Sequence, residues 1–255
     1  MIATSVLPAP RSLSTLWKPN LESAFLNPTD TRLLPSYTLS EAARYLWMNP
    51  STLRTWVAGR DYPAAGEQRH FEQLIIAPPG KPVSLSFINL VEAHVLSALR
   101  RQHKLRLDTI RLALDYLRNE MRSERPLVEH RFETDGLELF VEHLGQLVSV
   151  SSGGQTSMRQ MISIYLTRVD WDQDGLATRF FPFTRPNMNA QDPKIIVIDP
   201  DLSFGRPSIR DKGISAEIIV ERYQAGESVD LLARDYACGR EQIEEAIRCG
   251  IALAA

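Results

Sequence analysis

The sequence predicts a mostly helical α+β protein, and three observations lead to that class. Two short helix signals lie close together between residues 37 and 57, with apolar residues at helical spacing. Two longer amphipathic stretches follow, over residues 86–103 and 108–121. β-prone runs bounded by Pro and Gly then separate these helices from a helical C-terminal segment. A chain of 255 residues, 44% apolar and 24% charged, has the composition of a globular protein.

Residues 1–35 are rich in Pro, Ser, Asn and Leu without a hydrophobic period, which predicts an N-terminal arm. The first helix is predicted to begin after Thr38, because Thr38 and Glu41 have the spacing of a capping box. The second begins at Asn49-Pro50, since Asn accepts from free N–H groups and Pro fits the first helical position. Together they have the pattern of a helix-turn-helix.

The second helix places short polar side chains and one cation near its N-terminus: Ser51, Thr52, Arg54 and Thr55. Such groups contact phosphates and base edges when the second helix of a helix-turn-helix enters the major groove. Residues 37–122 carry twelve Lys and Arg against eight Asp and Glu, although the whole chain has a net charge of −2. We therefore predict a local DNA-binding patch. The alternative is an ordinary helical hairpin inside a larger core.

A β-hairpin, or wing, is predicted after the helix pair. The β-prone run 71–76 and the alternating residues Val83, Leu85 and Phe87 flank a Pro-Gly tip. Cations at the tip and the base would contact the phosphate backbone, although they also suit an ordinary surface hairpin. The predicted DNA-binding residues are Ser51, Thr52, Arg54, Thr55, Arg60, Arg69 and Lys81.

Two amphipathic helices follow the predicted wing. The first opens at Ser86 and places His94 on its apolar face, where a core histidine is a better interpretation than a ligand. The second is predicted to be capped by Asp108. The cationic cluster 100–106 between them has two interpretations, a solvated face or a contact with the DNA backbone. Residues 36–125 thus form the predicted DNA-binding domain, a winged helix-turn-helix.

Residues 126–198 predict a small hairpin-plus-helix unit. Residues 138–141 and 146–150 are β-prone runs around a Gly-containing turn, and residues 151–154 lead into a helix. Two further strand-like runs cover residues 178–183 and 194–198. Such a unit buries little apolar area alone, so we expect it to pack on a neighbour or on a second copy of the chain, as a possible dimerisation unit.

Residues 199–255 predict a C-terminal three-helix unit of homeodomain-like size. Ser215 and Ser228 cap its first two helices, and Gly239 precedes the third. This segment carries seven Lys and Arg against eleven Asp and Glu, with Glu241, Glu244 and Glu245 near the start of the third helix. Because carboxylates repel phosphates, we assign the unit to protein contacts.

The motifs of the common enzyme classes are absent from the sequence. It contains no Walker loop, no Gly-x-Ser-x-Gly, and no Cys or His spacing that suits a metal. Asp170, Asp172 and Asp174 resemble part of a calcium loop, but Phe181 stands where the bidentate Glu is needed, so an acidic turn is the better interpretation. We predict no enzyme activity, cofactor or metal. The N-terminus has no signal-peptide pattern and no run spans a bilayer, which predicts a cytoplasmic location.

Residues 37–122 resemble the winged helix-turn-helix domain of the MerR family. Thr52-Leu53-Arg54 matches the Thr-Leu-Arg of its second helix, with Thr55-Trp56 in place of two aromatics. Trp47 is a departure, because that family commonly has a small residue in the turn. The resemblance implies binding of operator DNA, as a dimer across two half-sites.

Residues 194–250 are similar to the family catalogued as domain of unknown function 433, on the runs Ser203-Phe-Gly-Arg-Pro, Leu232-Ala-Arg-Asp-Tyr and Ile243-Glu-Glu-Ala-Ile. Ala237-Cys238-Gly239 departs from its pattern. Many members are VapB-type antitoxins, which implies a PIN-type ribonuclease toxin as the partner and autorepression of the operator. An Arg inserted among the toxin's Mg²⁺ carboxylates would inhibit it, and our candidates are Arg206 and Arg210 in a Gly-Pro-rich loop. The alternative for Arg206 is a structural salt bridge. The alternative function is a MerR-like, ligand-responsive transcription factor without a toxin.

Overall fold

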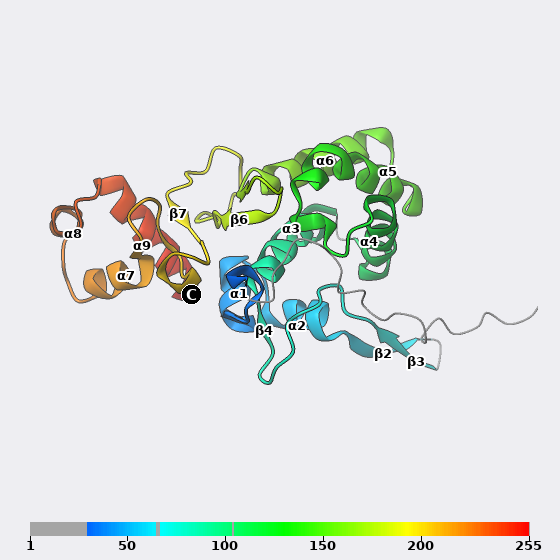
Figure 1. The fold of residues 1–255 in the computed structure, drawn as a ribbon, viewed down its shortest axis with the longest axis horizontal. Coiled ribbons are helices and arrows are strands. Elements are labelled where there is room, and N and C mark those ends of the chain that lie inside the picture. The colour runs from blue at the N-terminus through cyan, green and yellow to red at the C-terminus, as the bar shows by residue number, and fades with distance from the viewer. Residues whose placement is uncertain (1–29, 65–66, 104, 255) are drawn as a thin grey trace, which may run out of the picture.

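The structure is a computed structural model that describes residues 30–64, 67–103 and 105–254, so the predicted arm lies outside it up to residue 29. The predicted mostly helical α+β class is confirmed (Figure 1). The helices are α1 (Leu39–Tyr45), α2 (Pro50–Ala58), α3 (Phe87–His103), α4 (Leu107–Met121), α5 (Leu137–Leu147), α6 (Ser152–Leu166), α7 (Ala216–Gln224), α8 (Val229–Asp235) and α9 (Arg240–Ala254). Short helical turns lie at η1 (Thr31–Leu33), η2 (Pro126–Val128), η3 (Phe132–Gly136) and η4 (Ser203–Gly205). None of the described helices combines the length and apolarity that a membrane crossing needs.

The strands are short and form small antiparallel sheets. They are β1 (Tyr37–Thr38), β2 (Arg60–Ala64), β3 (Glu67–Phe71), β4 (Ser84–Leu85), β5 (Val169–Trp171), β6 (Ala177–Phe180), β7 (Ile196–Val197), β8 (Ser208–Ile209) and β9 (Ile214–Ser215). β1 pairs with β4, β2 with β3, and β5 with β6, whereas β7, β8 and β9 form one sheet. The sheets have two or three strands each, so the strands do not form a layer of their own.

The helix pair forms where the capping signals predict it. The Thr38 hydroxyl accepts from the Glu41 backbone N–H at 3.2 Å, and the Glu41 carboxylate accepts from the Thr38 backbone N–H at 2.8 Å, which completes the capping box. Asn49 caps α2 and Pro50 is its first residue. Apolar side chains of the pair are buried: Leu39, Ala42, Ala43, Leu46, Leu53, Trp56 and Val57.

Helix α3 is the centre of the larger core. Every residue from Phe87 to Leu99 is at most 6% exposed, so this stretch is buried on all sides and not on one face alone. His94 lies in this core, as predicted, with its Nε2 3.0 Å from the Tyr165 carbonyl oxygen. The buried Asn89 amide donates to Glu92 at 2.9 Å, and Glu92 forms an ion pair with Arg125 at 3.0 Å. The polar groups inside this helix are therefore paired, as burial requires.

The predicted position of the wing is wrong. The hairpin is formed by β2 and β3 over residues 60–64 and 67–71, and the described residues 72–83 form no strand. The rest of the run, residues 72–76, contacts α2 and does not pair as a strand. The backbone N–H groups of Leu74 and Ile75 donate to the Trp56 carbonyl at 2.7 and 3.1 Å. They thus satisfy the C-terminal end of α2. Three prolines between residues 78 and 82 also remove donors that a ladder would need.

The predicted hairpin over residues 138–150 is also wrong, because α5 occupies that position. Leu137, Phe140, Val141 and Leu144 recur at helical spacing and are buried between α4 and α6. The free energy gained by burying these side chains outweighs the preference of Phe and Val for strands. The following helix, α6, begins at Ser152, with Ser151 as its cap. The predicted start of α4 shifts slightly, since Asp108 lies inside the helix and Arg106 is at the cap position.

Two hydrophobic cores contain most of the buried apolar residues that the structure describes. The larger extends from Tyr37 to Ile198 and joins α1–α6 to β5 and β6. The smaller contains residues from Ile196 to Cys249 and is built by β7, β8, α7, α8 and α9. Figure 1 shows α7–α9 at one end of the elongated molecule and α4–α6 at the other, with α1–α3 between them. The two predicted segments 36–125 and 126–198 thus share one core.

The C-terminal unit has the three predicted helices, capped by Ser215 and Ser228 as expected. Three apolar side chains at helical spacing that would suit an inner face are instead on the surface: Ile218, Tyr223 and Leu231 are 48%, 40% and 36% exposed. The three helices do not enclose the core by themselves, because residues of the β7–β9 sheet cover part of it. Glu245 is 1% exposed and therefore is not one of the surface charges that the sequence suggested.

Candidate nucleic-acid interface

Helix α2 presents a polar face because its cap and its apolar residues fix its orientation. The Asn49 side chain accepts from both the backbone N–H and the hydroxyl of Ser51, each at 2.8 Å. Leu53, Trp56 and Val57 point into the core. The opposite face is left with Ser51, Thr52, Arg54 and Thr55, the four residues that the sequence predicted there.

Arg54 is the cation that α2 places on this face. It is exposed and forms no hydrogen bond or ion pair with any residue that the structure describes. The neighbouring hydroxyl groups are partly engaged, since Thr55 donates to the Ser51 carbonyl at 3.0 Å. Their oxygens still accept, and the guanidinium of Arg54 is available as a donor for phosphate or guanine.

A cleft of about 360 Å³ lies beside this face and gathers arginines from three parts of the chain. Arg60 comes from β2, Arg100 from the end of α3, and Arg106 from the start of α4. Arg100 donates to the Leu105 carbonyl at 3.0 Å, and Arg106 forms an ion pair with Asp108 at 2.6 Å. The lining residues are Ser51, Thr52, Thr55, Arg60, Phe71, Arg100, Arg106, Leu107 and Asp108. Three cations against one carboxylate make the cleft suited to an anion.

The structure brings together four of the seven predicted DNA-binding residues, namely Ser51, Thr52, Thr55 and Arg60, and Arg54 lies on the same helix. Arg69 is in β3, where its backbone faces Tyr62, and its side chain lies outside the described set. Lys81 is exposed in the loop before β4 and does not line the cleft.

The sequence named neither Arg100 nor Arg106 as an individual site residue. A sequence pattern could have identified both arginines, because they belong to the cationic cluster 100–106, which directly follows the apolar residues of α3. The helix ends there, so these arginines fall at the turn into α4, beside α2.

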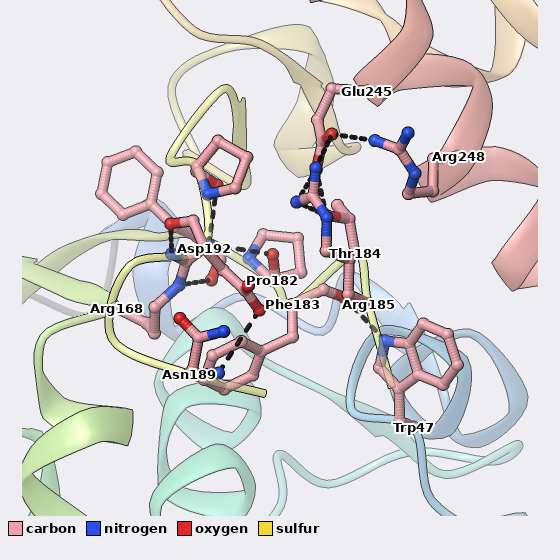
Figure 2. A network of polar contacts seen from close by, with 12 residues as sticks. Trp47, Arg168, Pro182, Phe183, Thr184, Arg185, Asn189, Asp192, Glu245 and Arg248 are labelled. Carbon is pink, nitrogen blue, oxygen red and sulfur yellow. Dashed lines mark hydrogen bonds and ion pairs between the residues drawn. The ribbon is translucent and has the colours of Figure 1, made fainter. Parts of the chain in front are cut away.

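The turn between α1 and α2 explains how Trp47 is accommodated. Trp47 has a φ of 53°, a left-handed conformation that is uncommon for residues other than Gly. Its indole Nε1 donates to the Phe183 carbonyl oxygen at 2.6 Å (Figure 2). Trp47 is large for this turn, but its side chain hydrogen-bonds to a segment that is distant in sequence.

That segment, residues 181–185, is held from both sides. The fully buried Arg168 donates to backbone carbonyls of this segment and of the following loop: Phe181 at 2.9 Å, Pro182 at 3.2 Å, Asp192 at 2.6 Å and Pro193 at 3.1 Å. Burial lowers the pKa of Arg168 to about 10, so it stays protonated at neutral pH. On the other side, Glu245 of α9 accepts from Thr184, Arg185 and Arg248 (Figure 2).

The two arginines predicted to contact a toxin have different surroundings. Arg206 forms an ion pair with Glu41 of α1, and hydrogen bonding to Glu41 and Tyr45 raises its pKa despite partial burial. It therefore forms the structural salt bridge that was the alternative interpretation, and it does not project from its loop. Arg210 is exposed, with its guanidinium 5.4 Å from the Phe181 ring and 3.5 Å from the Asp211 carboxylate.

The predicted interpretation of the Asp170–Gly175 stretch as an acidic turn fits the observed contacts. Asp172 Oδ1 accepts from the backbone N–H groups of Asp174 and Leu176 at 3.0 and 2.8 Å. Its second oxygen accepts from Arg32 at 2.7 Å. The carboxylate is thus occupied by the turn that it closes.

Two family models match separate parts of the chain, the first inside the larger core and the second over the smaller one. The family model described as "Putative DNA-binding HTH domain" matches residues 35–114, and the model described as "Protein of unknown function (DUF433)" matches residues 196–248. A curated relative, "Putative antitoxin VapB45" of Mycobacterium tuberculosis strain H37Rv, is 29% identical over an aligned length of 230 residues, and the alignment covers 84% of this chain and 93% of the relative.

The crystal structure of Rv2018 from Mycobacterium tuberculosis has the same fold, with a TM-score of 0.62 at 24% sequence identity over 84% of this chain and 98% of that one. The predicted resemblance to the DUF433 family is therefore confirmed for residues 196–248, and residues 35–114 are similar to helix-turn-helix DNA-binding domains. The finer assignment of the N-terminal part to the MerR family stays a prediction.

Proposed function

We propose that this protein is an antitoxin that binds operator DNA through α2 and holds a PIN-type ribonuclease through its C-terminal unit. The observation that supports DNA binding best is the exposed Arg54 on α2, next to a cleft to which Arg60, Arg100 and Arg106 all contribute. A helix that carries a free guanidinium and short hydroxyl side chains is suited to the major groove, and flanking cations are suited to the phosphates.

The division of charge supports a DNA-binding N-terminal part. Residues 37–122 carry the basic excess, whereas residues from 199 onward carry the acidic one. Operator recognition as a dimer would place two copies of α2 in successive major grooves, about 34–36 Å apart. Binding of the operator in front of its own gene would make the protein an autorepressor.

The ribonuclease partner is proposed from the similarity to the relative named antitoxin VapB45, which extends over most of both chains. The C-terminal unit is the part that we assign to it, since an acidic surface suits protein contacts better than DNA. Of the two arginines in the predicted inhibitory role, Arg210 is the better candidate, because the Arg206 guanidinium is held by Glu41.

The test of DNA binding uses the full chain and a fluorescent duplex from the region in front of its gene, with a shuffled duplex of equal length as the control. We expect tighter binding to the first duplex, and a log–log salt slope between 50 and 200 mM that corresponds to about 0.9 per neutralised phosphate. Absence of binding to either duplex at 50 mM salt would overturn the proposal.

The test of toxin binding is co-expression with the ribonuclease encoded beside the gene. We expect the two chains to elute together at a fixed ratio, and cleavage of a test RNA to stop when the antitoxin is present. A ribonuclease that elutes alone and stays active would refute this half of the proposal and leave the DNA-binding half standing.

A further inference from the structure

We propose that Phe204 is the residue through which the C-terminal unit anchors its protein partner. Its ring would insert into an apolar pocket on the partner's surface, and Lys or Arg side chains of the partner would surround that pocket. This inference rests on the proposed function, since the partner is the ribonuclease. Phe204 is 96% exposed, whereas the next most exposed large apolar side chain among the described residues, Leu112, is 55% exposed. Isolated exposed apolar residues are normal, so exposure alone does not make an anchor.

The backbone that carries Phe204 is held in an unfavourable conformation. Three consecutive residues have positive φ: Ser203 at 49°, Phe204 at 55° and Gly205 at 71°. Only Gly adopts this region readily, because the Cβ of any other residue is crowded there by the backbone. Gly or Asn would adopt the backbone conformation of residue 204 with less strain. The fold instead holds a large aromatic side chain there and exposes it to solvent.

Contacts on both sides make this turn rigid. The Ser203 hydroxyl donates to the Gly213 carbonyl at 2.6 Å, which ties the turn to the neighbouring turn between β8 and β9. A Cβ at Gly205 would lie 2.5 Å from the Tyr37 hydroxyl, so the turn is pressed against β1. Arg206, the next residue, is fixed by Glu41. A ring held in place before binding loses little entropy on association, which is a property of binding hot spots.

Charge around the turn favours a protein over a nucleic acid as the occupant. Asp201 in the same loop and Asp211 in the neighbouring turn are both exposed, and the exposed Arg210 lies 3.5 Å from the Asp211 carboxylate. Two further cations nearby already have partners within the chain: Arg206 forms an ion pair with Glu41, and the Lys212 ammonium donates to the Ala237 carbonyl at 2.9 Å. The segment from residue 199 onward also has a net excess of carboxylates. Phosphates would be repelled here, whereas a partner with Lys or Arg around its pocket would be attracted.

The test uses Phe204→Asn in the full chain. Asn removes the ring and tolerates positive φ better than Phe, so this variant is expected to fold with a Tm equal to or above that of the unmodified chain. Affinity for the separately purified ribonuclease, measured by calorimetry, is expected to fall by roughly thirtyfold or more, the loss typical of a hot spot. The control is Leu112→Ala on α4, which removes another exposed apolar side chain and should leave the affinity unchanged.

The outcomes separate this inference from the proposed function. If the unmodified chain does not bind the ribonuclease, the proposed function fails and the anchor fails with it. If the unmodified chain binds but Phe204→Asn binds equally well, the anchor is overturned while the proposed function stands. Weakened binding of the operator duplex, or loss of self-association in sedimentation, with ribonuclease affinity unchanged, would assign Phe204 to DNA or to a second copy and would overturn the anchor too.

Discussion

The indole nitrogen of Trp47 donates a hydrogen bond at 2.6 Å to the backbone carbonyl of Phe183, a residue 136 positions further along the chain. Trp47 lies in the turn of the helix-turn-helix, and Phe183 lies in the segment that leads towards the C-terminal unit. The turn that orients α2 is thus supported by residues outside the helix pair, and those residues are supported in turn by Glu245 of α9 (Figure 2).

Trp47→Phe should lower the free energy of unfolding by about 1–2 kcal/mol, because the Phe183 carbonyl loses a donor in a buried position. Urea unfolding monitored by circular dichroism measures this change. The matched control is Trp171→Phe, whose indole N–H makes no hydrogen bond to the described residues. A loss at Trp171 as large as that at Trp47 would show that ring size, and not the hydrogen bond, is responsible.

Glu245→Ala should be more costly than removal of the neighbouring carboxylate. Glu245 is 1% exposed and accepts from Thr184, Arg185 and Arg248, so its loss leaves two guanidinium groups without their partner. We expect a loss of about 2–3 kcal/mol in the free energy of unfolding. Glu244→Ala breaks only an exposed pair with Arg240 and should cost about 0.5 kcal/mol. Equal losses in thermal unfolding would contradict the role of the buried cluster.

Arg54→Ala should weaken operator affinity by about 1–3 kcal/mol and relax specificity, because we propose that this exposed guanidinium on α2 contacts base edges. Lys81→Ala should reduce the salt slope by about 1 and weaken binding to all duplexes alike, as expected of a phosphate contact. Fluorescence anisotropy with operator and shuffled duplexes at several salt concentrations distinguishes the two. Similar, sequence-independent losses from both variants would mean that α2 does not read bases.

Glu41 should make the stability of the fold depend on pH in the acid range. Burial alone would raise the pKa of Glu41, but hydrogen bonds from the backbone and side chain of Thr38 and from Arg206 hold it below the ordinary value of 4.5. Folding therefore favours the ionised carboxylate. Its contribution is complete above about pH 4.5, and it is lost as the pH falls through the lower pKa of the folded state.

Glu41→Gln should accordingly show a shallower decline of the free energy of unfolding between pH 5 and pH 3.5 than the unmodified chain. Denaturant titrations at a series of pH values measure both curves. Parallel curves would indicate that other carboxyl groups, such as Asp172, account for the acid sensitivity.

The sequence predicted those elements whose signals are local. Thr38 with Glu41, and Asn49 with Pro50, specify two helix starts within a few residues, and both starts are observed. The helix α5 was missed because Phe140 and Val141 suit a strand as well as a helix, and only burial between α4 and α6 decides between the two.

The candidate site was partly predictable for the same reason. The polar face of α2 follows from helical spacing, so its four residues could be named from the sequence. The contribution of Arg100 and Arg106 depends on where α3 ends relative to α2, which is a tertiary property. The engagement of Arg206 by Glu41 likewise joins residues 165 positions apart and leaves no signal in either neighbourhood.

The burial of α3 on every side limits which amino-acid substitutions this helix can tolerate. Between Phe87 and Leu99 no side chain has a solvent-facing alternative, so polar replacement at any of these thirteen positions has to be accommodated inside the protein. A deep mutational scan would show an unbroken band of intolerance there, whereas α4, with only one apolar stripe, would show tolerance rising and falling with each turn.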